Sequence, residues 1–194
     1  MKKSETTRQV ILQQAARLFA QRGYQGVTMQ AICDATSLSK GGVYRYFPNI
    51  DAIFLQLLQQ WQAHRKDCIA AMMAEKQPAE AILARVLEPL RTQTDADSGL
   101  ALAMYEYFAA HRQGENSDFL ALQFARGHES WLRLIEYGCR TGAFCCPAPG
   151  QAAALILFAW EGLRMCGAVM DTTAAMRGAV ADQIEALLGV HPHG

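Results

Sequence analysis

The sequence of 194 residues lacks the short motifs by which common enzyme classes are recognised. It has no glycine-rich phosphate loop, no HExxH metal motif and no GxSxG nucleophile motif. It also shows almost no strand pattern of alternating apolar and polar residues, so no sheet framework is expected to hold a nucleophile. We therefore predict an all-α protein that is not an enzyme and that binds no cofactor.

A secretory apolar segment is also absent near the N-terminus, and the most apolar run, residues 152–170, is interrupted by Glu161 and Arg164. These features predict a cytoplasmic chain without a membrane partner. The six cysteines form no CxxC pair, so we expect free thiols and neither a zinc site nor a disulfide framework.

The net charge of zero is the sum of two oppositely charged regions. Residues 1–50 contain seven Lys and Arg against two acids, a net charge of +5, and residues 51–194 contain eleven against sixteen, a net charge of −5. A basic N-terminal region can lie on a polyanion, whereas the acidic remainder is repelled by it.

Residues 28–49 have the pattern of two short helices joined by a tight turn. Thr28 can cap the first helix, in which Met29, Ile32 and Ala35 are spaced to share one face. Ser39 can cap the second helix. A helix-turn-helix of this kind can place its second helix in a DNA major groove.

The second helix carries Val43 and Phe47 at the spacing of a buried face. Its open side then presents Lys40, Gly41 and Arg45, and also Tyr44. Long cationic side chains suit guanine O6 and N7, although either cation could instead contact phosphate alone. Glycine leaves the helix backbone free to approach the bases closely.

Together with its flanks, this motif closely resembles the DNA-binding region of the TetR family of bacterial repressors over residues 7–58. The matching positions are Ile11, Ala15, Phe19, Gly23, Tyr24, Thr28, Ile32, Ser39, Lys40, Gly41, Tyr44, Tyr46 and Phe47. The resemblance implies a homodimer that binds a double-stranded DNA operator and is released by a small organic effector. The DNA-binding residues that it implies are Thr28, Gln30, Ser39, Lys40, Gly41, Gly42, Tyr44, Arg45 and Tyr46.

Four positions depart from the pattern of that family. Ile50 stands where Lys is common, so one phosphate contact is expected to be missing. Ser37 replaces a turn glycine whose φ is often positive, which predicts local strain. Gly42 replaces a common Thr, and Cys33 replaces a common Ala and should pack as a small apolar residue.

Helical spacing extends through the rest of the chain, and the whole resembles a nine-helix TetR-like fold. The remaining helices are expected over residues 5–22, 50–76, 79–94, 99–112, 117–141, 150–170 and 172–188. We assign residues 1–50 to a helix-turn-helix DNA-binding domain and residues 51–194 to an effector-binding and dimerisation domain. The long helix over residues 50–76 would connect the two.

The effector pocket is expected in the second domain, among bulky or polarizable side chains that suit a flat or apolar molecule. The candidates are Trp61, His64, Met104, Tyr105, Phe108, His111, Phe124, His128, Trp131, Glu161 and Met165. Taken singly, each aromatic or Met residue is also a plausible core residue. Glu161 could pair with Arg164, three residues further along the helix, or could bind a cationic ligand.

The last two helices should form the dimer interface, because residues 150–170 are apolar on nearly every side. The candidates for this four-helix bundle are Ala152, Ala153, Leu155, Leu163, Ala168, Ala179, Ile184 and Leu187.

Two alternatives stay open at this point. The protein could be a thiol- or soft-metal-sensing regulator of the same fold through Cys139, Cys145 and Cys146. It could also be a soluble ligand-binding protein whose DNA-binding face has decayed, as Ile50 and Gly42 would allow. The sequence does not identify the effector, the operator or the regulated genes.

Overall fold

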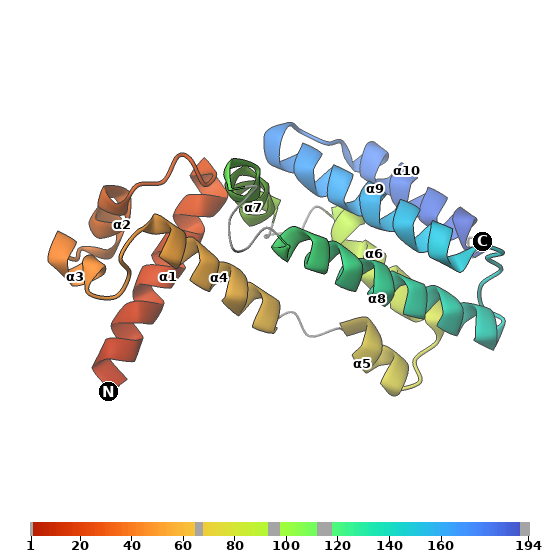
Figure 1. Cartoon of the computed structure of the whole chain (residues 1–194). Coiled ribbons are helices and arrows are strands. Elements are labelled where there is room, and N and C mark those ends of the chain that lie inside the picture. The colour runs from red at the N-terminus through yellow and green to blue at the C-terminus, as the bar shows by residue number, and fades with distance from the viewer. Residues whose placement is uncertain (1, 65–67, 93–97, 112–117, 191–194) are drawn as a thin grey trace. The chain divides into compact units, whose positions relative to one another are not determined.

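The computed structural model describes residues 2–64, 68–92, 98–111 and 118–190, and every regular element in these ranges is a helix. The all-α prediction is thereby confirmed (Figure 1). The helices are α1 (Lys2–Arg22), α2 (Met29–Thr36), α3 (Lys40–Tyr44), α4 (Ile50–His64), α5 (Cys68–Ala74), α6 (Ala79–Thr92), α7 (Ser98–Ala110), α8 (Phe119–Thr141), α9 (Pro149–Val169) and α10 (Ala174–Leu187).

The span predicted as a single helix, residues 50–76, contains two described helices, so the described ranges hold ten helices; residues 65–67, between these two, lie outside the described part of the chain. Helix α4 ends at His64 and α5 begins at Cys68. Ile69 and Met72 of α5 are buried in a hydrophobic core with residues of α6 and α8.

The helices form two compact units. The first contains α1–α4 together with α7, and the second contains α5, α6, α8, α9 and α10. The first unit therefore takes in α4 and α7 in addition to the N-terminal region assigned to DNA binding from the sequence. Helix α7 belongs to it because α7 packs extensively against α1.

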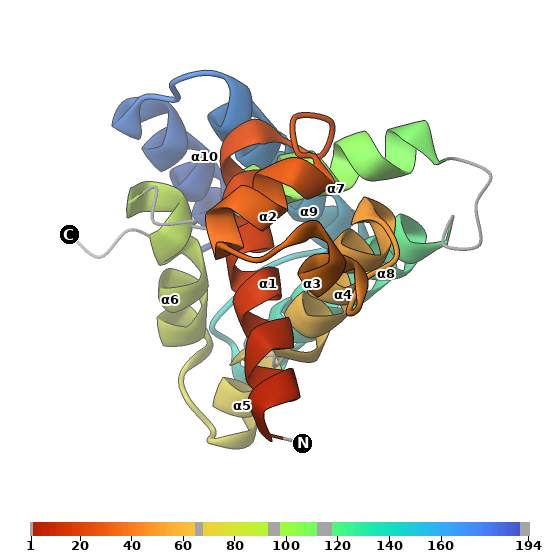
Figure 2. The same cartoon turned by 90° about the vertical axis from the view of Figure 1, so that its left-hand side faces the viewer.

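The first unit is built around α1, which packs against α2, α4 and α7 (Figure 2). Its centre is a cluster of aromatic rings on four different segments. The Phe19 and Phe54 centroids lie 4.8 Å apart, and the Tyr24 ring lies 5.0 Å from Phe54 and 4.9 Å from Tyr107. Gly99 of α7 meets the backbone of Ala20 so closely that an added Cβ would lie 2.2 Å from its carbonyl oxygen.

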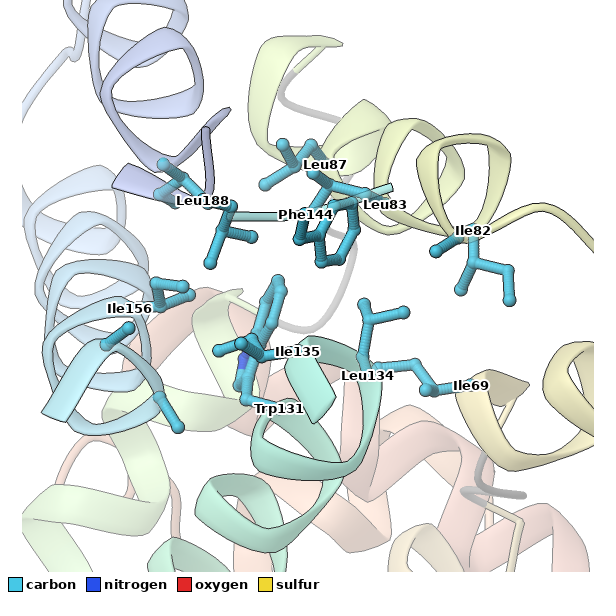
Figure 3. Close-up of a cluster of buried hydrophobic side chains, with 14 of the residues drawn as sticks. Ile69, Ile82, Leu83, Leu87, Trp131, Leu134, Ile135, Phe144, Ile156 and Leu188 are labelled. Atoms are coloured by element: carbon cyan, nitrogen blue, oxygen red, sulfur yellow. The ribbon is translucent and has the colours of Figure 1, made fainter. Parts of the chain in front are cut away.

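The second unit has α8 and α9 running side by side, with α6 and α10 packed along them (Figure 1). Its hydrophobic core joins all five helices and includes the fully buried Ile82, Leu87, Leu134, Ile135 and Leu188 (Figure 3). The segment after α8 folds back over the helix, because the Phe144 ring takes the space beside Gly138. A Cβ on Gly138 would lie 2.0 Å from that ring.

Within the described residues, α9 is the helix that has the length and apolar composition to cross a membrane. A core helix of a soluble protein can have the same length and apolar composition. Only 28% of its most apolar stretch is buried in the protomer, so much of its apolar surface faces outward.

Candidate nucleic-acid interface

The helix-turn-helix is held by side-chain caps at the positions that the sequence predicted. The amide of Ala31 donates to Thr28 Oγ1 at 3.1 Å, and the amide of Gly42 donates to Ser39 Oγ at 3.2 Å. These bonds satisfy backbone donors that a helix N-terminus otherwise leaves unpaired. Asn49 caps α4 in the same way, since its Oδ1 accepts from the amide of Ala52 at 2.8 Å.

The turn between α2 and α3 contains the strain predicted at Ser37, whose φ is +55°. A left-handed conformation of this kind is unfavourable for a residue with a Cβ. The turn compensates through backbone bonds, because the amides of Ser37 and Leu38 donate to the carbonyls of Asp34 and Cys33.

Helix α2 differs from the prediction in one residue of its buried face. Ile32 is fully buried and Met29 is half-buried, as expected, but Ala35 is exposed and Cys33 is buried in its place. The reason is geometric, because at 3.6 residues per turn the spacing from 29 to 35 leaves the two residues about 120° apart.

Helix α3 exposes the residues that the sequence assigned to DNA. Val43 and Phe47 are buried and anchor it, whereas Lys40, Gly41 and Tyr44 face solvent. No atom lies within 4 Å of where a Cβ on Gly41 would be, so the backbone is bare there. Gly42 is different, because its Cβ would meet the capping Ser39 Oγ at 3.2 Å.

Arg45 follows α3 and lies against its neighbour. Its guanidinium carbon is 5.0 Å from the centroid of the Tyr46 ring, and its Nη2 donates to Tyr46 Oη at 2.8 Å. The two side chains thus form one cationic, planar unit on the surface. Gln30 of α2 is also exposed, and its Nε2 donates to Asp34 Oδ1 at 2.8 Å.

Helix α7 holds the segment between α1 and α2 through a contact that the sequence did not predict. The Glu106 carboxylate accepts from the amide of Tyr24 at 2.6 Å and from that of Gln25 at 3.3 Å. It also occupies the space beside Gly23, whose φ is +69°. No local pattern joins residues 82 positions apart, so sequence reasoning had no signal for this contact.

Tyr24 connects the same segment to α4. Its hydroxyl donates to Asp51 Oδ1. Burial, then the hydrogen bond and the negative charge of Asp51, raise the pKa of Tyr24 well above its usual value. Burial and the Asp51 charge also raise the pKa of Tyr107. Both phenols are neutral at physiological pH.

The effector-pocket candidates divide between the two units. Met104, Tyr105, Phe108 and His111 lie on or directly after α7 in the first unit, and the remaining described candidates are in the second: Phe124, His128, Trp131, Glu161 and Met165. The side chains of Trp61 and His64 lie outside the described part of the chain.

Several of these candidates have structural partners. Met104, Phe108 and Trp131 are buried core residues. Glu161 accepts from Arg164 Nη1 at 3.0 Å, which is the pairing that the sequence offered as the alternative to a cationic ligand. His128 lies in the second unit, with Nε2 at 3.1 Å from the carbonyl oxygen of Gly150.

The dimer candidates need revision. Ala152, Ala153 and Ile184 are buried in the core of the second unit, so they are not available on the surface of the protomer. The helical spacing could not say which face of an all-apolar helix points inward. Leu155, Ala179 and Leu187 are exposed, and Leu163 and Ala168 are half-buried.

Two stripes of exposed residues, one on each helix, replace them, and together we call them the α9–α10 apolar face. Leu155, Phe158 and Val169 of α9 are 60%, 65% and 68% exposed, and they lie on one stripe with Gly162. On α10 the face continues through Met176, Ala179 and Leu187.

The cysteines are all free thiols. Cys145 is exposed, Cys139 and Cys146 are half-buried, and Cys139 Sγ lies 4.0 Å from the carbonyl oxygen of Cys146. Among the described residues, no group of three or more His, Cys, Asp or Glu side chains is arranged to hold a metal ion.

Comparison with known proteins finds regulators of transcription. The family model described as "Bacterial regulatory proteins, tetR family" matches residues 11–57. The HTH-type transcriptional repressor KstR2 of Rhodococcus jostii is 27% identical over 139 residues, which cover 69% of this chain and 66% of that protein. The HTH-type transcriptional regulator YfiR of Bacillus subtilis is 28% identical over 138 residues, with the same coverage. The matched region thus spans slightly less than two thirds of the length of these relatives.

The fold is shared with solved structures along nearly the whole chain. A TetR transcription regulator from Haloarcula marismortui has a TM-score of 0.76 at 19% identity, covering 95% of this chain and 97% of that one. A transcriptional regulator from Saccharomonospora viridis in complex with choline has a TM-score of 0.79 at 22% identity, covering 93% and 96%.

Proposed function

Because this chain belongs to the TetR family of bacterial regulatory proteins and is a helix-turn-helix transcriptional regulator, we propose that it is a homodimeric, ligand-responsive repressor. Two protomers place residues 39–46 in successive major grooves of a palindromic operator, about 34–36 Å apart. A small organic effector in the C-terminal region releases the dimer from DNA. The protein acts in the cytoplasm, where the DNA is.

The observation that supports operator binding is the surface of α3. This short helix is capped by Ser39 and exposes Lys40, Tyr44 and the backbone at Gly41. The buried side chains of Val43 and Phe47 anchor it to the core. Lysine can reach guanine O6 and N7, and the tyrosine hydroxyl can donate to phosphate. Arg45 and Tyr46 add a cation stacked on a ring beside this surface.

The test is binding to duplexes selected from a random pool, measured by fluorescence anisotropy. We expect Lys40→Ala to weaken binding to the selected duplex by about 1–3 kcal/mol and to relax its base preference. Tyr44→Phe should weaken binding to all duplexes more evenly. Arg85→Ala, at an exposed site on α6, is the matched charge control and should have no effect.

Salt dependence separates the repressor from a ligand-binding protein with a decayed DNA surface. A protein that neutralises phosphates loses affinity steeply as salt rises, because counterions are released on binding. Binding that is absent or that does not change between about 50 and 200 mM salt would support the decayed surface. Unchanged affinity in both the Lys40 and Arg45 alanine variants would remove those side chains from the interface.

The α9–α10 apolar face supports the dimer. Its exposed leucine, phenylalanine and valine side chains would lose their contact with water in a four-helix bundle formed with a twofold-related copy. A large apolar patch on a soluble regulator is typical of a protein–protein interface.

An organic effector is supported by the shared fold, since one structural neighbour was solved with choline. Effector and operator affinities must then be linked, so each ligand weakens binding of the other by the same factor. The site itself is expected in the C-terminal region. The half-buried Met165 is a cleaner probe of it than Trp131 or Phe108, because the latter two are core residues.

One variant distinguishes a thiol-sensing regulator from a regulator that is released by an organic effector. Replacing Cys139, Cys145 and Cys146 together by Ser should leave operator binding and release by an organic inducer intact. Loss of release in this variant, with release of the wild type by peroxide alone, would favour the thiol sensor.

A further inference from the structure

We infer that Asp34 determines base specificity by orienting the side chain of Gln30, so that α2 reads an adenine at the edge of the operator half-site. The inference rests on the proposed binding of DNA by the first unit. It assigns a role to Asp34, an acidic residue whose charge does not favour DNA binding.

The geometry of the pair is well defined. Gln30 Nε2 donates to Asp34 Oδ1 at 2.8 Å, and both residues lie on the solvent-exposed side of α2. Their backbone is fixed at both ends of the helix. Thr28 caps the first turn, and the amide of Ser37 closes the last turn on the carbonyl of Asp34.

The negative charge of Asp34 is unfavourable both for α2 and for DNA binding, so a contribution to stability alone does not explain it. It is one of only two acids among residues 1–50, which contain seven Lys and Arg. It lies in the last turn of α2, where a negative charge opposes the helix dipole. It would also repel DNA phosphates. A Gln–Asp pair four residues apart stabilises a helix by only about 0.2–0.5 kcal/mol, which is no larger than these opposing effects.

The hydrogen bond has a chemical consequence for Gln30. An ionised carboxylate only accepts hydrogen bonds, so the amide must turn its NH2 group toward Asp34. One amide hydrogen is used by Asp34. The other hydrogen and Oε1 remain as a donor–acceptor edge, and that edge matches N7 and the N6 amino group of adenine.

Without Asp34 the same amide can rotate and donate to a phosphate or accept from a different base. Asp34 therefore limits Gln30 to one hydrogen-bonding pattern. Its charge also lowers the affinity for DNA of any sequence. The first effect raises discrimination between the operator and other DNA, whereas a uniform loss of affinity leaves that discrimination unchanged.

The experiment compares wild type with Asp34→Ala, Asp34→Asn, Gln30→Ala and the double alanine variant. Each protein first selects duplexes from a random pool, which identifies the base pair whose preference is lost in Gln30→Ala. Affinities are then measured for the selected duplex, for that duplex with the identified base pair replaced, and for random duplex. Asp34→Glu keeps the carboxylate and is the conservative control.

We expect the identified base to be adenine. Asp34→Ala and Asp34→Asn should bind random duplex more tightly and should discriminate at that base pair about tenfold less than wild type. Asp34→Glu should retain most of the discrimination. The double variant should match Gln30→Ala in discrimination, because Asp34 acts through Gln30.

An equal gain in affinity for all three duplexes, with discrimination unchanged, would show that Asp34 is only a surface charge and would overturn the inference. A base other than adenine at the identified position would overturn it as well. Failure of the wild type to enrich any duplex is a different result, because it refutes the proposed function. Unfolding curves that match wild type show that the exposed substitutions have not altered the fold.

Discussion

The two units of this protein expose opposite kinds of surface. In the first unit, the outward groups of α2 and α3 are polar or cationic, they lie on short capped helices, and Gly41 leaves the backbone bare. In the second unit, the long helices α9 and α10 expose large apolar side chains on the α9–α10 apolar face, among them Leu155, Phe158 and Met176. The first surface suits a hydrated polyanion, whereas the second suits another apolar helix pair.

Side-chain caps occur in both units, at Thr28, Ser39 and Asn49 in the first and at Thr173 in the second, but they matter most for the shortest helices. The short helices α2 and α3 need them, because a helix of eight or five residues is only marginally stable without help. The long helix α8 begins without a side-chain cap bond at its N-cap residue. Its stability comes from the buried face around Leu134 and Ile135.

The largest expected effect comes from a charge on the α9–α10 apolar face. Leu155→Glu would bury a carboxylate in each half of the proposed dimer interface, and a buried unpaired charge is strongly unfavourable. We expect the dimer dissociation constant to rise at least about 100-fold, measured by sedimentation equilibrium. The measurement also tests whether the wild type is a dimer at micromolar concentration.

Leu122→Glu is the matched control, because Leu122 of α8 is 54% exposed, similar to Leu155, but is not part of that face. It should leave association unchanged. Equal effects of the two variants, or a monomeric wild type, would contradict the assignment of the α9–α10 apolar face as the dimer interface.

The next effect concerns the interior of the second unit. Gly138→Ala forces a Cβ to within 2.0 Å of the buried Phe144 ring, so the ring or the helix must move. We expect the free energy of unfolding to fall by about 3 kcal/mol, measured by urea denaturation. Gly178→Ala on α10 meets no atom within 4 Å and should raise it by up to about 1 kcal/mol. A neutral Gly138→Ala would mean that the Phe144 segment is not packed on α8.

A smaller effect is expected in the first unit at the contact between α7 and the α1–α2 segment. Glu106→Ala removes an acceptor from the amides of Tyr24 and Gln25, which should cost about 1.5 kcal/mol. Hydrogen exchange of those two amides should accelerate, while core amides of α8 should not change. Glu129→Ala, at an exposed position on α8, is the control. Unchanged exchange at Tyr24 would argue against α7 as a member of the first unit.

The Tyr24–Asp51 bond predicts a pH effect in the same unit. The pKa of Tyr24 is raised in the folded protein above the value of about 10 of an unfolded tyrosine. Above that value the unfolded chain loses the proton first, so stability is complete below about pH 10 and decreases as pH rises toward the folded pKa. Tyr24→Phe should be less stable near neutral pH, since it lacks the bond to Asp51, but should lose less stability in this alkaline range. Equal alkaline slopes in the two proteins would contradict the assignment.

The fold class, the helix-turn-helix and its caps could be predicted from the sequence because they are local. A capping hydroxyl at Thr28 or Ser39 acts within three residues, and buried Val43 and Phe47 follow from helical spacing. The positive φ of Ser37 was expected because Ser37 stands where the TetR family commonly has a turn glycine.

The remaining features depend on contacts between distant residues. The hydrogen bond from the Tyr24 amide to the Glu106 carboxylate joins residues far apart in the chain. In the second unit, the residues of α9 itself are apolar on nearly every side of the helix, so spacing alone could not separate the buried Ala153 from the exposed Leu155. The pocket candidates were chosen by residue type, and residue type does not separate a lining residue from a core residue such as Trp131.

The smallest expected change in stability is also the most direct test of the bare surface on α3. Gly41→Ala adds one methyl group to a position with no atom within 4 Å, so it should not clash. Because alanine favours helix, stability should rise by up to about 1 kcal/mol. Affinity for a selected duplex should nevertheless fall, since the methyl group lies where the backbone is proposed to approach the bases.

Gly42→Ala is the companion variant, and its Cβ would press on the Ser39 cap at 3.2 Å, so it should not share the gain in stability. Thermal unfolding and anisotropy on the same samples separate the two effects. If Gly41→Ala gains stability and keeps full affinity, the bare backbone does not contact DNA, and recognition by α3 must depend on the side chains of Lys40 and Tyr44.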